Sequence, residues 1–153
     1  MDQFSCRTES REDEPFIRGL MMETLVDQLG ASSWPDSVRE PVLDAQYRVR
    51  RQGFRMSAGD KPGTLVLVNG EPVAWYVAAE LPDEIRLVNL VVLRERRGKG
   101  IGTAVLRKLA GSRKTLKLSV AMNNHRAFDL YTRMGFRRTG DDGVHYFMEL
   151  PAQ

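Results

Sequence analysis

The hydrophobic pattern of the chain is clearest between residues 85 and 109. It begins with an almost unbroken apolar run, which is typical of a strand covered on both faces. The apolar residues of this run are Ile85, Leu87, Val88, Leu90, Val91, Val92 and Leu93. Glycines then alternate at positions 98, 100 and 102, and Ile101, Val105 and Leu109 follow at helical spacing. The pattern predicts a buried strand, a glycine-rich turn and a helix.

Two helices are predicted in the N-terminal third. The first begins near residues 11–15, where acidic residues and Pro15 suit a first helical turn, and it ends at Gly30. The second is expected to be capped by Asp36 or Ser37 and to end at Gly53. Its apolar stripe is Val38, Val42, Ala45 and Val49. Residues 3–7, before both helices, are a weak candidate for an edge strand.

Strands are predicted on both sides of the glycine-rich turn. Residues 64–68 and 71–80 flank Asn69-Gly70, a pair that favours a type I′ hairpin turn. Residues 115–120 and 144–150 alternate between apolar and polar positions. Between them, Asn123 or Asn124 is expected to cap a helix that ends at Gly135. The apolar stripe of this helix is Ala127, Leu130, Tyr131 and Met134.

Length and composition favour one domain, residues 1–153, in a soluble protein. The chain has 42% hydrophobic and 28% charged residues and a net charge of +3. We expect neither a membrane span nor a signal peptide, because no apolar window is long enough and the first ten residues are polar. With a single cysteine, Cys6, an intramolecular disulfide is excluded. These features predict a cytoplasmic protein, and His125 and His145 lack the ligand spacing of a metal site.

The glycine-rich turn predicts an anion cradle. Glycine allows a left-handed backbone, and the free N–H groups at the start of a helix attract a phosphate. Arg96, Arg97 and Lys99 add positive charge there. A Walker A loop is excluded because Gly100 is followed by Ile101, and a dinucleotide fingerprint lacks its downstream carboxylate near Val120. A tight turn with solvated charges is the structural alternative.

Two motifs resemble the GNAT superfamily of acyl-CoA-dependent N-acyltransferases. Arg97-Gly98-Lys99-Gly100-Ile101-Gly102 fits its R/Q-x-x-G-x-G/A signature, and the preceding strand resembles the family's fourth strand. Residues 124–136 are similar to its second motif, with Asn124, Ala127, Tyr131 and Gly135-Phe136 at the expected positions. The resemblance extends over residues 65–136. It implies an α/β fold of the α+β type, with a mixed, mostly antiparallel sheet of six to seven strands, splayed at the glycine loop, and about four helices.

The resemblance also implies an enzyme that transfers an acetyl group from acetyl-CoA to a primary amine by direct attack in a ternary complex. Tyr131 would be the general acid that protonates the departing thiolate. The residues that would bind the cofactor are Leu90, Val91, Val92, Arg97, Gly98, Lys99, Gly100, Ile101, Gly102, Thr103 and Asn124. The strand backbone would pair with the pantetheine arm and supply an oxyanion donor, and the glycine loop with Thr103 would hold the diphosphate.

The general base and the acceptor are left open by the sequence. Several family members use a carboxylate on the central strand, where this chain offers only Arg86 and Asn89. Bases acting through water would be Glu80, Glu84, His145 or Glu149. Trp34, Gln46 and Tyr47 are candidates for an acceptor site, with ordinary core or surface roles as the alternative. The acceptor would be a small molecule or a peptide, and the family resemblance also allows a homodimer.

Two other functions are alternatives to the enzyme. A non-catalytic GNAT-fold module that binds acyl-CoA as a sensor or interaction domain would fit the missing strand carboxylate. A nucleic-acid-binding module would use the basic residues 94–113, but no aromatic residues for base stacking interleave with them. We therefore expect no nucleic-acid partner.

Overall fold

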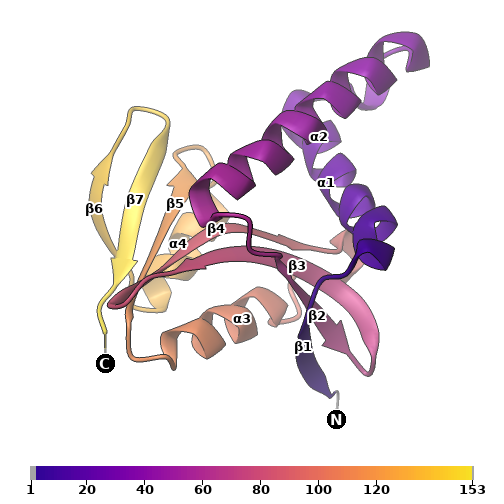
Figure 1. Cartoon of the computed structure of the whole chain (residues 1–153). Coiled ribbons are helices and arrows are strands. Elements are labelled where there is room, and N and C mark those ends of the chain that lie inside the picture. The colour runs from indigo at the N-terminus through magenta and orange to yellow at the C-terminus, as the bar shows by residue number, and fades with distance from the viewer. Residues whose placement is uncertain (1–2, 153) are drawn as a thin grey trace. The chain divides into compact units, whose positions relative to one another are not determined.

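A computed structural model describes residues 3–152 and shows a seven-stranded sheet together with helices (Figure 1). The strand order is β1-β2-β3-β4-β5-β7-β6. The strands are β1 (Phe4–Thr8), β2 (Thr64–Val68), β3 (Glu71–Glu80), β4 (Glu84–Val92), β5 (Thr115–Ala121), β6 (Arg137–Asp141) and β7 (His145–Leu150). The α-helices are α1 (Glu14–Leu29), α2 (Asp36–Ala58), α3 (Ile101–Ala110) and α4 (His125–Arg133). Short 3-10 turns cover Arg11–Asp13, Ala31–Ser33 and Arg94–Arg96.

The sheet is mixed and mostly antiparallel, as the sequence predicted. Strand β4 pairs in parallel with β5, from Glu84 opposite Thr115 to Leu87 opposite Leu118. The pairs β1–β2, β2–β3, β5–β7 and β6–β7 are antiparallel. The weakly predicted N-terminal strand is real and lies at an edge of the sheet. The predicted hairpin turn is also confirmed, with φ of 52° at Asn69 and 82° at Gly70.

The chain groups into two compact units. The first is Met1–Val77 with Asn89–Ile101, and the second is Ala78–Val88 with Gly102–Gln153. Strands β3 and β4 therefore each pass from one unit to the other. One domain over the whole chain stays a prediction.

The core of the first unit combines α1 with β2 and β3. Helix α1 ends as predicted at Gly30, which has φ of 62°. Its completely buried face and the buried strand residues include Ile17, Leu20, Met21, Leu25, Leu65, Val66, Val73 and Trp75. Helix α2 lies beside α1 (Figure 1). This packing holds α1 in place largely by burial of apolar surface.

Helix α2 differs from its prediction in its start, its end and its orientation. Pro35 occupies the N-cap position without a side-chain cap bond, so neither Asp36 nor Ser37 caps it. The helix runs past Gly53 to Ala58, because an interior glycine costs only about 1 kcal/mol relative to alanine and packing compensates. That packing includes Phe54, whose ring centroid lies 5.9 Å from that of Trp75.

The buried face of α2 is also not the predicted one. Leu43, Tyr47 and Ala58 are buried, whereas Val38, Val42 and Val49 of the predicted stripe are 50%, 37% and 63% exposed. The reason is that Tyr47 and Leu43 offer more surface to α1 than the valines do, so they determine which face turns inward. The predicted valine stripe is present in the sequence, but it lies on the solvent-exposed face of α2.

The second unit contains β5, β6, β7, α4 and the part of α3 that starts at Gly102. Its core includes Val105, Leu106, Leu116, Phe136 and Met148, all buried. Strand β5 and helix α4 lie where the sequence predicted them, and Gly135, with φ of 104°, follows α4 as expected. Among residues 3–152, no helix has the length and apolar character needed to cross a membrane.

Candidate active site

The glycine loop follows β4 after the short 3-10 turn Arg94–Arg96 and leads into α3. The left-handed conformations expected of it are present, with φ of 76° at Gly98 and 83° at Gly100. A Cβ built on Gly100 would meet no atom within 4 Å, so the space beside this backbone is open. Residues with side chains rarely adopt such angles, and the loop conformation therefore depends on glycine. Both residues are exposed and come just before the first turn of α3, where backbone N–H groups have no partner within the helix, and this arrangement suits a phosphate.

The basic side chains around the loop differ in the contacts that they make. The Nε of Arg97 donates to the carbonyl oxygen of Val92 at 3.1 Å and so ties the loop to the end of β4. Arg94 donates to both carboxylate oxygens of Asp27 at 2.8 Å, and Arg96 lies 4.0 Å from a carboxylate oxygen of Glu71. Lys99 is exposed. The positive charge and the open backbone together fit a polyanion such as a diphosphate.

The predicted cofactor residues belong to both units. Leu90, Val91 and Val92 lie at the end of β4 in the first unit, with Val91 buried and the other two half-buried. The loop residues up to Ile101 are in the same unit. Gly102 and Thr103, in the first turn of α3, belong to the second unit, as do Asn124 and Tyr131. The chain is continuous at Ile101–Gly102, but the roles of all these residues stay predictions.

Asn124 is the N-cap of α4, one of the two caps that the sequence proposed. Its side-chain oxygen accepts a hydrogen bond from the backbone N–H of Ala127 at 3.2 Å. The side-chain NH₂ group of an asparagine remains a donor when its oxygen is used in this way. Asn124 is exposed. It therefore caps α4 through its side-chain oxygen, and the cap does not use its side-chain NH₂ group.

Tyr131 lies near the end of α4 in a partly apolar environment. Its ring centroid is 5.6 Å from that of Phe136, and the two rings are tilted by 54°. Burial raises the pKa of the Tyr131 phenol above its ordinary value of 10. The phenol is therefore fully protonated at neutral pH, as a general acid must be.

Comparisons with known proteins agree with this geometry. The family model described as "Acetyltransferase (GNAT) family" matches residues 23–136. The chain belongs to the GNAT acetyltransferase family.

Solved structures show the same fold at low sequence identity. The PaiA N-acetyltransferase of Thermoplasma acidophilum, solved in complex with coenzyme A, is 18% identical with a TM-score of 0.70, and the match covers 99% of both chains. The ribosomal-protein-S18-alanine N-acetyltransferase of Escherichia coli is 20% identical with a TM-score of 0.67, covering 99% of this chain and 95% of that one. An acetyltransferase of Thermus thermophilus is 19% identical with a TM-score of 0.70, covering 97% of each chain. A search of curated protein sequences finds no match.

In this GNAT chain, the three carboxylates considered as general bases are all held by cations. Glu80 lies 2.9 Å from Lys114, and Glu149 lies 3.3 Å from Lys117. Glu84 contacts Arg86 at 3.1 Å and Lys117 at 3.5 Å, and the hydrogen bond from Arg86 is the main cause of its lowered pKa. Arg86 itself is exposed. Each of these three carboxylates therefore already has a cationic partner.

His145 is different, because its neighbour is an acid. Its Nδ1 lies 3.4 Å from a carboxylate oxygen of Asp142. Asp142 in turn accepts backbone N–H bonds from Val144 at 2.9 Å and His145 at 2.6 Å, and these lower its pKa. The ionised Asp142 thus orients the imidazole from one side and leaves the other ring nitrogen available. A histidine backed by a carboxylate is a common arrangement for a base.

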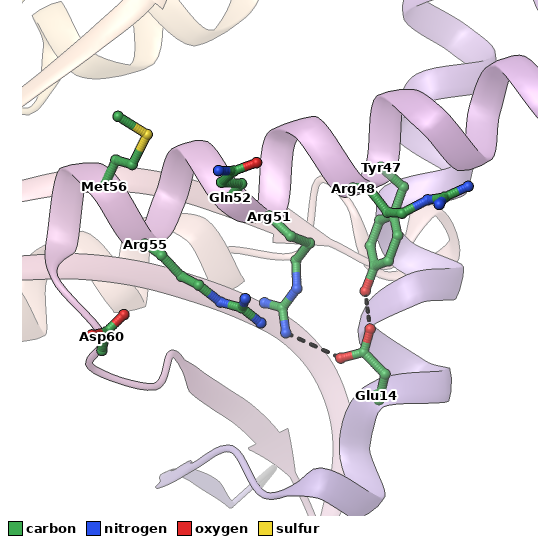
Figure 2. A pocket seen from close by; sticks show the side chains of 8 residues that line it. All are labelled: Glu14, Tyr47, Arg48, Arg51, Gln52, Arg55, Met56 and Asp60. Atoms are coloured by element: carbon green, nitrogen blue, oxygen red, sulfur yellow. Dashed lines mark hydrogen bonds and ion pairs between the residues drawn. The ribbon is translucent and has the colours of Figure 1, made fainter.

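Of the acceptor-site candidates, Tyr47 has a defined environment that the sequence did not predict. It is buried, its hydroxyl donates to Glu14, and the guanidinium of Arg18 lies 5.1 Å from its ring centroid. Figure 2 shows Glu14 between Tyr47 and Arg51. Trp34 is half-buried and Gln46 is exposed. The tyrosine is a core residue at the edge of a cavity, which no local motif indicates.

Proposed function

We propose that this protein is an N-acetyltransferase that moves the acetyl group of acetyl-CoA to a primary amine of a small molecule or peptide by direct attack in a ternary complex. The observation that carries the proposal is the glycine loop, with Gly98 and Gly100 left-handed at a strand-to-helix turn in a GNAT-family chain. Two proteins of the same fold support it, one an N-acetyltransferase solved with coenzyme A and the other a ribosomal-protein-S18-alanine N-acetyltransferase.

Binding of the cofactor would be shared between backbone and side chains. The N–H groups of residues 98–103 would hold the diphosphate, assisted by the charges of Arg97 and Lys99. The backbone of Leu90–Val92 would pair with the pantetheine amides as a strand does, and the side-chain NH₂ of Asn124 would donate to the same arm. Acetyl-CoA supplies a thioester, whose carbonyl carbon is open to attack by an amine.

Proton transfer would be divided between two side chains. A neutral amine attacks the thioester carbon, while a backbone N–H of residues 90–92 stabilises the charge that develops on the carbonyl oxygen. Tyr131 would give its proton to the departing sulfur, so that a thiol leaves. For the base that takes the proton from the amine nitrogen we choose His145 over Glu80, Glu84 and Glu149, because those three carboxylates are paired with Lys or Arg side chains, whereas His145 lies beside the carboxylate of Asp142.

A thermal melt tests the cofactor. A ligand that binds only the folded state stabilises it by about 2.7 kcal/mol at a hundredfold excess over Kd. For a chain of this size we expect acetyl-CoA to raise Tm by roughly 5–10 °C. NAD and ATP serve as controls, and an equal rise with either would show general attraction of anions to a basic surface.

A coupled assay tests the reaction itself. Acetyl-CoA is incubated with a panel of small amines and peptides, and free thiol is measured as it forms. Thiol release that depends on one class of amine supports the transferase and identifies the acceptor class. A clear rise in Tm without thiol release from any amine would favour the non-catalytic acyl-CoA-binding module instead.

A further inference from the structure

Helix α2 has two apolar faces, and only one of them is covered. Leu43, Tyr47 and Ala58 form the buried face, while Val38, Val42, Val49 and Met56 are 50%, 37%, 63% and 80% exposed. A helix that is apolar on opposite sides is normally buried on both. The exposed side chains are not scattered, and their positions define one line along the helix.

The exposed line has the spacing of a coiled-coil seam. Counting along α2, positions 38, 42, 45, 49, 52 and 56 alternate in steps of four and three residues, as the a and d positions of a heptad repeat do. Ala45 and Gln52, which complete the series, are also exposed. We call these six residues the α2 seam: Val38, Val42, Ala45, Val49, Gln52 and Met56. A strict seam of this kind fits another helix better than a loop or a strand.

The charges beside the seam have one sign. The flanking e and g positions are 39, 41, 46, 48, 53 and 55, and their charged members are Arg39, Arg48 and Arg55. Arg39 pairs with Asp36 and Arg48 with Asp44, both exposed pairs within the helix. Among the residues that the structure describes, Arg55 has no ion-pair partner. A second copy of this chain would bring the same basic flanks and place no acid opposite them.

A cavity beside the C-terminal half of the seam adds to this charge. It has a volume of about 640 Å³ and is lined by Glu14, Tyr47, Arg48, Arg51, Gln52, Arg55, Met56 and Asp60. Figure 2 shows Arg51 and Arg55 extending below α2 toward Glu14, with Gln52 and Met56 above it. Gln52 and Met56 thus belong both to the cavity wall and to the seam.

Arg51, which lines the cavity, is held in place by several contacts. This side chain lies 3.0 Å from Glu14 and 3.6 Å from Glu9, and its guanidinium is 5.0 Å from the ring centroid of Trp75. Both carboxylates are therefore already paired, and Glu9 also accepts from the backbone N–H of Gly63 at 2.5 Å. Arg55 keeps its donors for a carboxylate that comes from outside.

From the seam, its basic flanks and this cavity we propose that α2 is a docking surface for an acidic amphipathic helix of another protein. The apolar face of that helix would cover Val38, Val42, Val49 and Met56. A carboxylate on its edge would enter the cavity and pair with Arg55. The proposal does not depend on transferase activity.

The test uses two labelled synthetic helical peptides, each about three heptads long with leucine at a and d. One carries glutamate at e and g and the other lysine, and binding is followed by fluorescence anisotropy at low salt. The acidic peptide is expected to bind the wild-type protein at least about tenfold more tightly, and added salt should weaken it. Equal affinity for both peptides would overturn the proposal.

Variants locate the binding to α2. Val49→Asp and Arg55→Glu should each weaken the acidic peptide about tenfold or more. The matched controls are Val144→Asp, at a valine that is 62% exposed, and Arg137→Glu, at an exposed arginine of β6. All four changes are on the surface, and a thermal melt checks that each variant is folded.

Two results would contradict this assignment. One is peptide affinity that is the same for Val49→Asp and Val144→Asp, because the seam would then not be the contact. The other is a dimer of the wild-type protein in analytical ultracentrifugation that Val49→Asp dissociates, because a second copy would then occupy the seam.

Discussion

Replacing Gly100 with alanine separates the fold of the glycine loop from its function, because the chain contains a matched control. Gly100 has φ of 83° and Gly70, in the β2–β3 turn, has φ of 82°. A Cβ on either would meet no atom within 4 Å. The conformational cost of alanine is therefore the same at both positions, about 1–2 kcal/mol for a left-handed residue. In a chain of this length each kcal/mol lowers Tm by roughly 2–4 °C.

Only the loop variant is expected to lose cofactor affinity. If Gly100→Ala relieves its strain by leaving the left-handed region, the nearby N–H groups turn away from the diphosphate. Losing one hydrogen bond to a charged group costs about 1.5–3 kcal/mol, which is a factor of roughly 10–100 in Kd. Isothermal titration with acetyl-CoA measures this loss, and melting curves without ligand check that both variants are folded. If Gly100→Ala bound acetyl-CoA as tightly as Gly70→Ala, the phosphate-cradle assignment would be wrong.

Three further predictions test single side chains. Tyr131→Phe should lower kcat about 10²- to 10⁴-fold with little change in acetyl-CoA affinity, because it removes the proton donor but keeps the ring; turnover at the wild-type rate would exclude it as the acid. Burial, and then the hydrogen bond to Glu14, raises the pKa of Tyr47 to about 12 from 10.0, so the protonated phenol stabilises the fold fully below pH 10 and this contribution disappears as pH rises toward 12. An ultraviolet titration should show late-ionising tyrosines, of which Tyr47→Phe removes one, and an unchanged late phase in that variant would contradict the burial argument. Gly53→Ala should stabilise the protein by roughly 0.5–1 kcal/mol in denaturant unfolding, because Gly53 is inside α2 with open space at its Cβ, and a loss of stability would show hidden strain there.

The features that the sequence predicted well are those fixed by a few adjacent residues. Asn69-Gly70 determines its own turn because both residues adopt left-handed angles easily. Gly30 ends α1 for a similar reason, and the alternating glycines of the loop place the turn between β4 and α3. Each of these signals depends on local backbone preference, so no knowledge of distant contacts is needed.

The features that the sequence did not predict depend on residues far apart in the chain. The face of α2 that turns inward is set by α1 and by Trp75, which no periodicity within α2 reveals. The valine stripe and the Leu43–Tyr47 face are both apolar at helical spacing, and only tertiary packing decides between them. In the same way, the pairing of Glu14 with Tyr47 and Arg51 joins residues more than thirty positions apart.

The choice of His145 as the base leads to a test that distinguishes a proton acceptor from a structural residue. A strongly basic amine reaches the enzyme protonated and must lose a proton before it attacks, whereas a weakly basic amine arrives neutral at pH 7. His145→Gln keeps a polar side chain beside Asp142 but removes the base. The variant should therefore be slowed much more with a strongly basic acceptor than with a weakly basic one of similar shape, with acetyl-CoA affinity unchanged in both assays. Equal slowing for the two amines would mean that His145 only shapes the β6–β7 turn, and the proton would have to leave through water held elsewhere.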